Sequence, residues 1–299
     1  MKKYFVVSDI HGFYDEFIRD LTKAGYDKEN PNHILVVLGD IFDRGTQPLE
    51  VYNYLKSIPR ERRILVRGNH EILLKDLIDR GYPESHDEHN RTIDTVYQLN
   101  GYKSYRQFMK GMYKEESEKD IKYGTPEYEN FRLYWRNKQK EIFHADLIKE
   151  ILDWIDSDEW QDYFETKDYI FVHSFIPVKE YLNIEKSLWC GFYVYDGPPD
   201  YREDWRNATE MEWNDAKWGC PWKQAKSGLN KTGKIIVCGH WHTSDIFNHL
   251  KNANNKHTYK QTYNPIVVSK RYKLIGIDAC TALTREVNVF TFEEEETNE

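Results

Sequence analysis

The chain has 299 residues and carries 42 Lys and Arg against 50 Asp and Glu, a formal net charge of −8. This acidic balance excludes the broad basic surface needed for non-specific nucleic-acid binding. No apolar run is long enough to span a bilayer, so we expect no membrane partner. The length suffices for one large core, and we expect residues 1–299 to form a single domain.

Cysteine usage and the N-terminus favour a reducing cytoplasm as the location. The four cysteines are widely spaced, without a C-x-x-C pair. The segment after Met1 runs directly into an apolar, strand-like stretch and does not read as a cleavable signal. At the other end, the acidic run 293–296 predicts a solvated, frayed terminus.

The first 80 residues alternate between strand and helix patterns, which predicts crossover connections and a largely parallel sheet. The expected strands are 3–8, 34–39 and 63–67, and the expected helices are 13–23, 48–57 and one that begins near residue 70.

The pattern changes over residues 82–166, where we expect helices and no strand. The apolar spacing predicts one helix over 93–109 and one or two more over 128–152. The later helices follow a break at Gly124, with Thr125 as N-cap and Pro126 at the first helical position. We interpret this region as a helical insertion that either covers the sheet or forms a lid over the substrate entrance.

The chain after His173 reads as a loop-rich stretch with a strong turn at Gly197. Strand patterns return near the end, at residues 273–278 and 287–292.

Five short motifs rich in Asp, His and Gly each follow an apolar, strand-like run. They are Ser8–Gly12, Gly39–Gly45, Gly68–Glu71, His173–Ser174 and Gly239–Thr243. Sites in α/β proteins gather at the carboxyl ends of strands, so we expect these motifs to meet in one site.

The motifs together offer ligands for two metal ions. Asp9 and His11 lie two apart on an extended segment and so point the same way, toward one ion. Asp40 can bridge two ions through its two carboxylate oxygens. Further ligands are the amide oxygen of Asn69 and the imidazoles of His173 and His240. This mixed nitrogen and oxygen set favours manganese, with iron, zinc or nickel as alternatives.

Three residues of the same motifs then remain for catalysis. His70 follows the ligand Asn69, which places its ring near a leaving-group oxygen and makes it the natural general acid. Asp43 can hydrogen-bond this imidazole and fix its tautomer. Arg44 can hold phosphate oxygens with its fork of donors.

Each motif alone has an ordinary structural explanation, such as a buried satisfied pair for D-x-H or a helix N-cap by Asn69. The G-D-x-x-D-R-G and G-N-H-E pair is the most specific signal, and the order of all five motifs favours the metal-site interpretation.

These residues resemble the calcineurin-like metallophosphoesterases, in particular PPP-type serine/threonine protein phosphatases of bacterial and phage type. The resemblance covers roughly residues 1–80, 168–175 and 234–292. It implies two facing β-sheets flanked by helices, with a dinuclear site at one rim. Its implied roles, by motif, are one metal on Asp9, His11 and Asp40, the other on Asp40, Asn69, His173 and His240, the acid pair His70 and Asp43, and phosphate binding by Arg44.

The sequence departs from the family pattern in several places. Ser8 stands where the family usually has glycine, and Ser174 and Phe175 replace a Gly-Gly turn. His242 is extra relative to most protein phosphatases; in the wider superfamily the second histidine of G-H-x-H completes the first metal's shell. The family's second phosphate-binding arginine has no clear counterpart, although Arg202 and Arg206 lie in the corresponding stretch.

We therefore expect a phosphomonoesterase, most simply a serine/threonine protein phosphatase, in which a hydroxide shared by the two metals attacks phosphorus in line. Its substrate would be a phosphoprotein or a phosphorylated small molecule or nucleotide. The main alternative is a dinucleoside polyphosphate hydrolase, whose substrate would stack on some of the chain's many aromatic residues. A phosphodiesterase and a non-catalytic binding protein are further alternatives.

Overall fold

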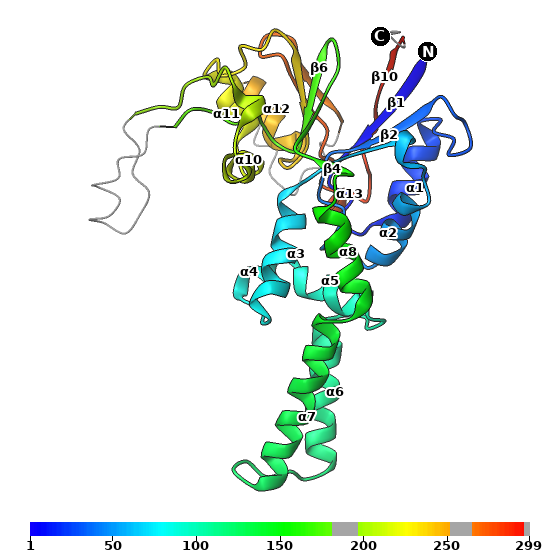
Figure 1. Ribbon diagram of the computed structural model, residues 1–299, viewed down its shortest axis with the longest axis vertical. Helices are drawn as coiled ribbons and strands as arrows, with labels where there is room; N and C mark the ends of the chain where they lie inside the picture. The colour runs from blue at the N-terminus through cyan, green and yellow to red at the C-terminus, as the bar shows by residue number, and fades with distance from the viewer. Residues whose placement is uncertain (181–196, 252–264, 296–299) are drawn as a thin grey trace.

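A computed structural model describes residues 1–180, 197–251 and 265–295 and contains two five-stranded mixed sheets (Figure 1). The first sheet has the order β10-β1-β2-β3-β4 and the second β5-β6-β7-β9-β8. The strands are β1 (Lys2–Val7), β2 (His33–Val37), β3 (Arg63–Val66), β4 (Trp160–Gln161), β5 (Tyr163–Glu165), β6 (Tyr169–Val172), β7 (Ile235–Cys238), β8 (Val267–Ser269), β9 (Leu274–Gly276) and β10 (Phe290–Glu294).

The motif-bearing strands run parallel within each sheet. In the first sheet β1, β2 and β3 are mutually parallel, and in the second β6, β7 and β9 are parallel. These strands are short apolar runs buried on both faces, as parallel strands usually are. Their carboxyl ends therefore bring the five motifs to one rim.

The two sheets face each other across an apolar layer. Val6 and Val36 of the first sheet and Phe171 and Val237 of the second belong to one fully buried cluster. Phe171 also stacks on Phe292 of β10, with ring centroids 5.2 Å apart. The fold of two facing sheets flanked by helices is thus confirmed.

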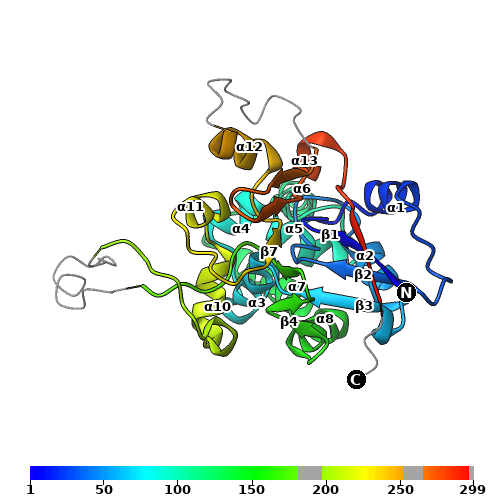
Figure 2. The same cartoon turned by 90° about the horizontal axis from the view of Figure 1, so that it is seen from above.

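Helices flank both sheets (Figures 1 and 2). The helices of the described residues are α1 (Tyr14–Lys23), α2 (Pro48–Lys56), α3 (Asn69–Arg80), α4 (Ser85–Asn90), α5 (Thr92–Leu99), α6 (Tyr105–Glu118), α7 (Pro126–Phe143), α8 (Asp146–Asp156), α10 (Glu210–Lys217), α11 (Pro221–Lys226), α12 (Thr243–Lys251) and α13 (Thr281–Thr284), with 3₁₀ turns at Arg60–Arg62 and Trp205–Asn207. None of the helices in the described part of the chain combines the length and apolar character that a bilayer crossing requires.

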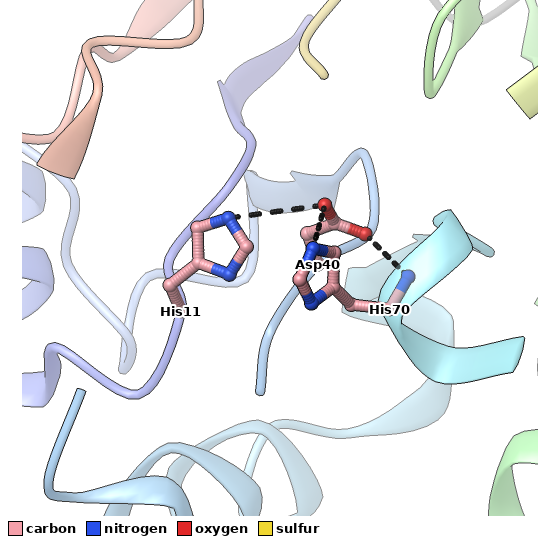
Figure 3. A group of neighbouring side chains, drawn as sticks. All are labelled: His11, Asp40 and His70. Atoms are coloured by element: carbon pink, nitrogen blue, oxygen red, sulfur yellow. Dashed lines mark hydrogen bonds and ion pairs between the residues drawn. The ribbon is translucent and has the colours of Figure 1, made fainter. Parts of the chain in front are cut away.

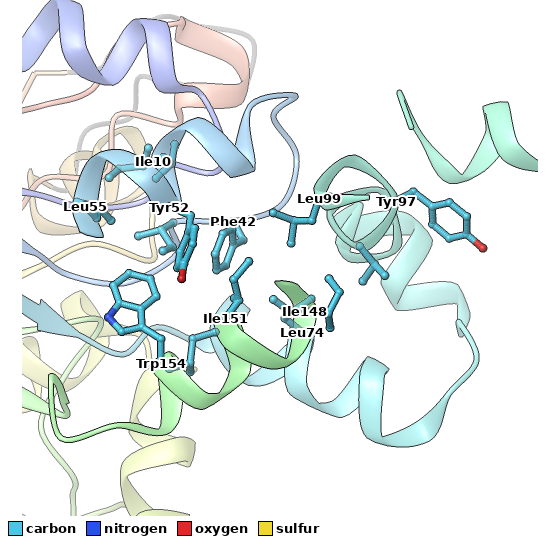
Figure 4. Close-up of a cluster of buried hydrophobic side chains, with 14 of the residues drawn as sticks. Ile10, Phe42, Tyr52, Leu55, Leu74, Tyr97, Leu99, Ile148, Ile151 and Trp154 are labelled. Carbon is cyan, nitrogen blue, oxygen red and sulfur yellow. The ribbon is translucent and has the colours of Figure 1, made fainter. Parts of the chain in front are cut away.

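The largest core lies against the first sheet and joins it to the insertion. Figure 4 shows Phe42 and Tyr52 packed against Ile151 and Trp154 of α8. Tyr52 also meets the Trp154 ring edge-on, with centroids 5.2 Å apart. The insertion is therefore built into the core of the domain through α5 and α8.

The middle of the insertion has a different character. Helices α6 and α7 form a long hairpin that extends away from the sheets (Figure 1). The N-cap at Thr125 is confirmed, since its hydroxyl accepts a hydrogen bond from the Tyr128 N–H and Pro126 is the first helical residue. The hairpin follows α5 on the side of the sheets where α3 lies, and its role as a lid stays a prediction.

Some sequence expectations for the insertion were wrong. The single helix over 93–109 is two helices, because Gly101 adopts φ +81° after Leu99 and Ser104 caps a new helix. The strand-free reading of 82–166 also fails, since β4 and β5 lie inside it. These strands have two and three residues, too few for a periodic pattern in the sequence. They are strands only because they pair with β3 and β6.

Two further corrections concern the C-terminal third. The stretch read as loop-like after His173 contains α10 and α11, and α10 begins with a capping box at Thr209 and Glu212 that its sequence already encodes. The acidic run was expected to fray, yet Glu293 and Glu294 lie in β10 opposite Lys3 and Lys2 of β1. Opposite charges on paired strands explain this placement. Strand β8 was not foreseen.

The hairpin's distal half should be dispensable for chemistry. Replacing residues 114–129 with a short Gly/Ser linker between Tyr113 and Asn130 removes little of the buried core and nothing at the rim, because the core residues Met112 and Phe131 remain. Closing a short loop here costs little entropy, so the variant should fold. We expect its activity on a small aryl phosphate to stay within about twofold of wild type. Steady-state kinetics with a thermal melt as folding control would check this. A folded variant with greatly reduced turnover would show that the hairpin supports the site.

Candidate metal centre and active site

Backbone hydrogen bonds tie the motif loops to one another at the rim. The His11 N–H donates to the Asp40 carbonyl over 2.9 Å, and the Gly239 N–H donates to the His173 carbonyl over 2.9 Å. Glycines at the strand ends allow this approach: a Cβ on Gly68 would collide with the Asp40 backbone and carboxylate. The five motifs therefore lie together at one rim, as the sequence predicted.

The backbone at the rim is unusually strained. Left-handed φ angles are rare and costly for residues other than glycine, at about 1–2 kcal/mol each. Six motif residues adopt them, namely Asp9 (52°), His11 (52°), Asp40 (55°), Asp43 (73°), Arg44 (57°) and His240 (62°). Strain concentrated in this way is typical of a functional site.

The first ligand group consists of His11, Asp40 and His70 (Figure 3). The Nε2 atoms of His11 and His70 each lie 3.8 Å from Asp40 Oδ2. Asp40 Oδ1 accepts a hydrogen bond from the His70 backbone N–H over 2.9 Å. Burial opposes ionisation of Asp40, but its neighbouring imidazoles, chiefly His173 and His70, outweigh burial and hold the pKa well below the usual range.

The second ligand group consists of Asp40, His173 and His240. His173 Nδ1 donates to the Leu38 carbonyl over 2.7 Å, which leaves a lone pair on Nε2. This Nε2 lies 2.8 Å from Asn69 Oδ1, 3.2 Å from His240 Nδ1 and 3.5 Å from Asp40 Oδ1. Asp40 thus belongs to both groups.

The donor set of the second group fits a divalent cation. Burial lowers the pKa of His173, and burial together with His173 lowers that of His240 to about 3, so both rings are neutral. The Asn69 oxygen and the Nε2 lone pair of His173 are then two acceptors that face each other. Such a convergence of lone pairs is stabilised by a cation, and imidazole with amide and carboxylate oxygen suits a borderline metal.

The first group offers a cation one neutral imidazole and two carboxylates. His11 Nδ1 donates to the Phe42 carbonyl over 2.9 Å, and burial with the Arg44 charge lowers the His11 pKa well below its usual value. Its Nε2 is therefore an acceptor; it lies 3.8 Å from Asp40 Oδ2 and 3.9 Å from Asp9 Oδ1, and it accepts a hydrogen bond from Arg44 Nη1 over 2.9 Å, which a bound cation would replace. Burial, Asp278 and Asp40 raise the pKa of Asp9 above its usual value.

Glu71 supports the shared ligand, a role that sequence reasoning did not assign. Its carboxylate accepts hydrogen bonds from the backbone N–H groups of Asp40, Ile41 and Gly68 over 2.8–2.9 Å. It is fully buried. The fourth position of the G-N-H-E motif therefore fixes the loop that presents Asp40.

The His70 ring is held by Asp43, as expected. His70 Nδ1 lies 2.6 Å from Asp43 Oδ2. Burial opposes protonation of His70, but the Asp40 and Asp43 carboxylates outweigh it and raise the His70 pKa above its usual value. His70 is thus suited to carry a proton.

Two threonines of the insertion complete this pair and were missed by the sequence analysis. Thr92 Oγ1 donates to Asp43 Oδ2 over 2.7 Å, and Thr95 Oγ1 donates to Oδ1 over 2.9 Å. Both lie on α5 and are buried. Their spacing of three places them on one helix face, but nothing in the sequence said which carboxylate that face would meet.

Arg44 lies across the two histidines of the first group. Its Nη1 is 2.9 Å from His11 Nε2 and its Nη2 is 3.3 Å from His70 Nε2. Its carbonyl accepts a hydrogen bond from Arg91 Nη1 over 2.7 Å. The guanidinium therefore stands between a metal ligand and the proposed acid.

His242 does not join either ligand group. Its Nδ1 lies 3.5 Å from Asp245 Oδ2 and its Nε2 lies 4.0 Å from Asp278 Oδ2. Burial opposes protonation, but Asp278 and Asp245 raise the His242 pKa to about 11. The two carboxylates thus favour the protonated ring in this arrangement, and the assignment of His242 as a metal ligand stays a prediction.

The two arginines considered as a second phosphate ligand lie in other ion pairs. Arg202 contacts Asp204 and Glu212, and Arg206 Nη2 lies 2.6 Å from Glu165 Oε1. Both pairs hold the loop before α10 and not the motif rim.

Comparisons with known proteins identify the family of the chain. The sequence model of the calcineurin-like phosphoesterase family matches residues 2–244. A symmetrical bis(5'-nucleosyl)-tetraphosphatase of Buchnera aphidicola is 42% identical over 74 residues, which is 25% of this chain and 26% of the relative. An asymmetrical enzyme of that name from Bacillus subtilis is 38% identical over 74 residues, 22% of this chain and 30% of the relative. The chain thus matches about a quarter to a third of these relatives' length.

Likeness to solved structures concerns the fold alone. The cold-active protein-tyrosine phosphatase of a psychrophilic Shewanella species aligns over 98% of this chain and 76% of its own, with a TM-score of 0.50 and 16% identity. Together with the family match over most of the chain, the two facing sheets and the clustered motifs lead to one conclusion: the chain belongs to the calcineurin-like phosphoesterase family.

Proposed function

We propose that the protein is a metal-dependent phosphoester hydrolase. The observation that carries the proposal is that Asp40 belongs to two clusters of possible metal ligands, one with His11 and His70 and one with His173 and His240, while Asp43 holds the His70 ring for proton transfer. Asp9, His11 and Asp40 would hold one ion, and Asp40, Asn69, His173 and His240 the other. Bound divalent ions, with manganese as our first choice, would supply Lewis acidity and an activated water.

The chain's own residues then divide the remaining work. Arg44 holds phosphoryl oxygens with paired charge-assisted donors. Since Arg44 Nη2 lies 3.3 Å from His70 Nε2, a phosphoryl group bound there brings its leaving oxygen to His70. The His70 imidazolium gives its Nε2 proton to that oxygen as the P–O bond breaks, while Asp43 holds Nδ1 and stabilises the charge.

A phosphomonoester is the substrate that the motifs first suggested, with phosphoserine or phosphothreonine proteins as the leading class. Nucleoside polyphosphates form the second candidate class, and the names of the relatives matched over the N-terminal region support it. Turnover of a phosphoserine peptide, diadenosine tetraphosphate and p-nitrophenyl phosphate by manganese-loaded protein would test the proposal. Failure to hydrolyse any of them with metal bound would contradict it.

The shared carboxylate should control metal content. We predict that Asp40→Asn lowers metal affinity by at least about 100-fold, because even residues that only orient ligands are worth 10–100-fold. Metal analysis after dialysis would measure it. Asp76→Asn, an exposed position on α3, is the matched control. Two retained ions per Asp40→Asn chain would remove Asp40 from the centre.

The acid should matter most for poor leaving groups. General acid catalysis contributes typically ~10²–10⁴-fold, and a serine alkoxide needs a proton whereas nitrophenolate does not. We predict that His70→Asn keeps its metals and loses far more activity on phosphoserine peptides than on p-nitrophenyl phosphate, with Asp43→Asn showing the same bias more weakly. Equal losses on both substrates would mean that His70 positions the phosphate and does not protonate the leaving oxygen.

The insertion should share this leaving-group dependence through α5. Thr92→Val and Thr95→Val remove hydrogen bonds to a buried carboxylate, each worth about 1.5–3 kcal/mol. We predict roughly 10-fold or greater loss of kcat on the phosphoserine peptide, near-normal turnover of p-nitrophenyl phosphate, and rescue by the Ser variants. Thr125→Val, which loses the cap of α7, controls for stability. Uniform losses that Ser does not rescue would assign the threonines to folding alone.

A further inference from the structure

Trp218 is an unusual tryptophan at the motif rim. Of the four tryptophans between residues 205 and 222, three are buried, namely Trp205 (0% exposed), Trp213 (3%) and Trp222 (8%). Trp218 is 50% exposed and directly follows α10 as its C-cap residue. Its apolar surface is thus left to solvent, although a core that accepts three other indoles lies beside it.

The exposed ring borders the second ligand group. The centroids of the Trp218 and His240 rings lie 5.9 Å apart, with the planes at 89°. His240 Nδ1 in turn lies 3.2 Å from His173 Nε2. The exposed indole is thus one contact away from two candidate metal ligands.

The position of Trp218 is fixed by the same loops that carry the ligands. The carbonyl of the next residue, Gly219, accepts hydrogen bonds from Ser174 Oγ and Trp241 Nε1, both over 2.8 Å. Ser174 follows His173, and Trp241 follows His240. The indole is therefore pre-positioned. Binding a ligand over it costs little conformational entropy of the protein.

We propose that Trp218 is the stacking platform for the nucleobase of a nucleotide substrate. The inference rests on the proposed phosphoester hydrolysis and names its substrate class. Every base has a π-face that stacks on an aromatic side chain. Burying the exposed indole surface under a planar base adds the favourable transfer of apolar area from water.

The location of the ring favours a nucleobase over the other phosphorylated aromatic group, phosphotyrosine. His70, which faces the leaving oxygen, lies by Asp40 Oδ2, whereas His173, beside His240 and Trp218, lies by Asp40 Oδ1. A tyrosine ring is bonded directly to its leaving oxygen and stays near His70. A base is separated from the reacting phosphorus by ribose and phosphate and reaches the other side.

The chemistry is ordinary hydrolysis of a phosphoanhydride or ester. The attacking water gives one proton to solvent, its oxygen forms a new bond to phosphorus, and the bond to the leaving oxygen breaks with its electron pair; His70 takes up a proton from solvent before the next cycle. The proton from His70 goes to that oxygen. Trp218 takes no part in these steps and acts on binding alone.

Binding of products tests the platform without relying on turnover. Calorimetry of metal-loaded protein should show tighter binding of ADP than of pyrophosphate, which has the same anhydride and no base. Trp218→Ala should weaken ADP binding by roughly 5- to 150-fold and leave pyrophosphate unchanged, and Trp218→Phe should restore most of the difference. Tyr123→Ala, an 87% exposed ring on the α6–α7 hairpin, is the matched control.

Kinetics with diadenosine tetraphosphate and tripolyphosphate should repeat this pattern in KM with kcat nearly unchanged. Equal binding of ADP and pyrophosphate by the wild type, or equal losses for both in Trp218→Ala, would overturn the inference. So would a loss confined to phosphotyrosine peptides. Discrimination of ADP by Trp218 without hydrolysis of any phosphoester would instead overturn the proposed function and leave the platform standing.

Discussion

One buried carboxylate, that of Asp40, organises the centre of this protein. It lies within reach of imidazoles on both sides, so a single side chain connects the two ligand groups. A charge buried in this way is tolerated only if neighbours stabilise it, and here backbone N–H groups, histidines and the cations they would bind all serve that end. The Glu71 carboxylate fixes the Asp40 loop by accepting hydrogen bonds from three backbone N–H groups. The convergence of strand ends from two different sheets is what makes such an arrangement attainable.

Local signals in the sequence predicted the strands β1, β2 and β3 and the residues that gather at their ends. Asp40, Asn69 and His173 could be identified because glycine, acid and histidine recur at strand ends, where chain direction alone brings them together. The hydroxyls of Thr92 and Thr95 could not, because their contact with Asp43 depends on how α5 packs. Strands β4 and β5 are created by pairing and leave no periodic trace. The spacing of His240 and His242 is the same whether the second ring binds a metal or, as observed, faces Asp278.

The insertion has two parts with different physical roles. Its ends, α5 and α8, supply core side chains and the hydroxyls that hold Asp43, so removing all of residues 82–166 would dismantle the acid pair along with any outer structure. The α6–α7 hairpin continues the same core outward through Phe108 and Trp135, whose ring centroids lie 5.0 Å apart. An insertion can thus become indispensable at its base while its tip remains free to diverge.

The left-handed residues at the rim have a consequence for how the protein can evolve. Glycine would adopt each of these φ angles with less strain. The native side chains therefore lower the stability of the fold by on the order of 1 kcal/mol each. Stabilising substitutions at these positions would therefore remove the side chains that carry the donor atoms. In a lineage no longer selected for catalysis, we would expect glycine or asparagine to replace Asp9, His11 and Arg44 early. The rim would then be more stable and would lack the groups that bind metal and phosphate.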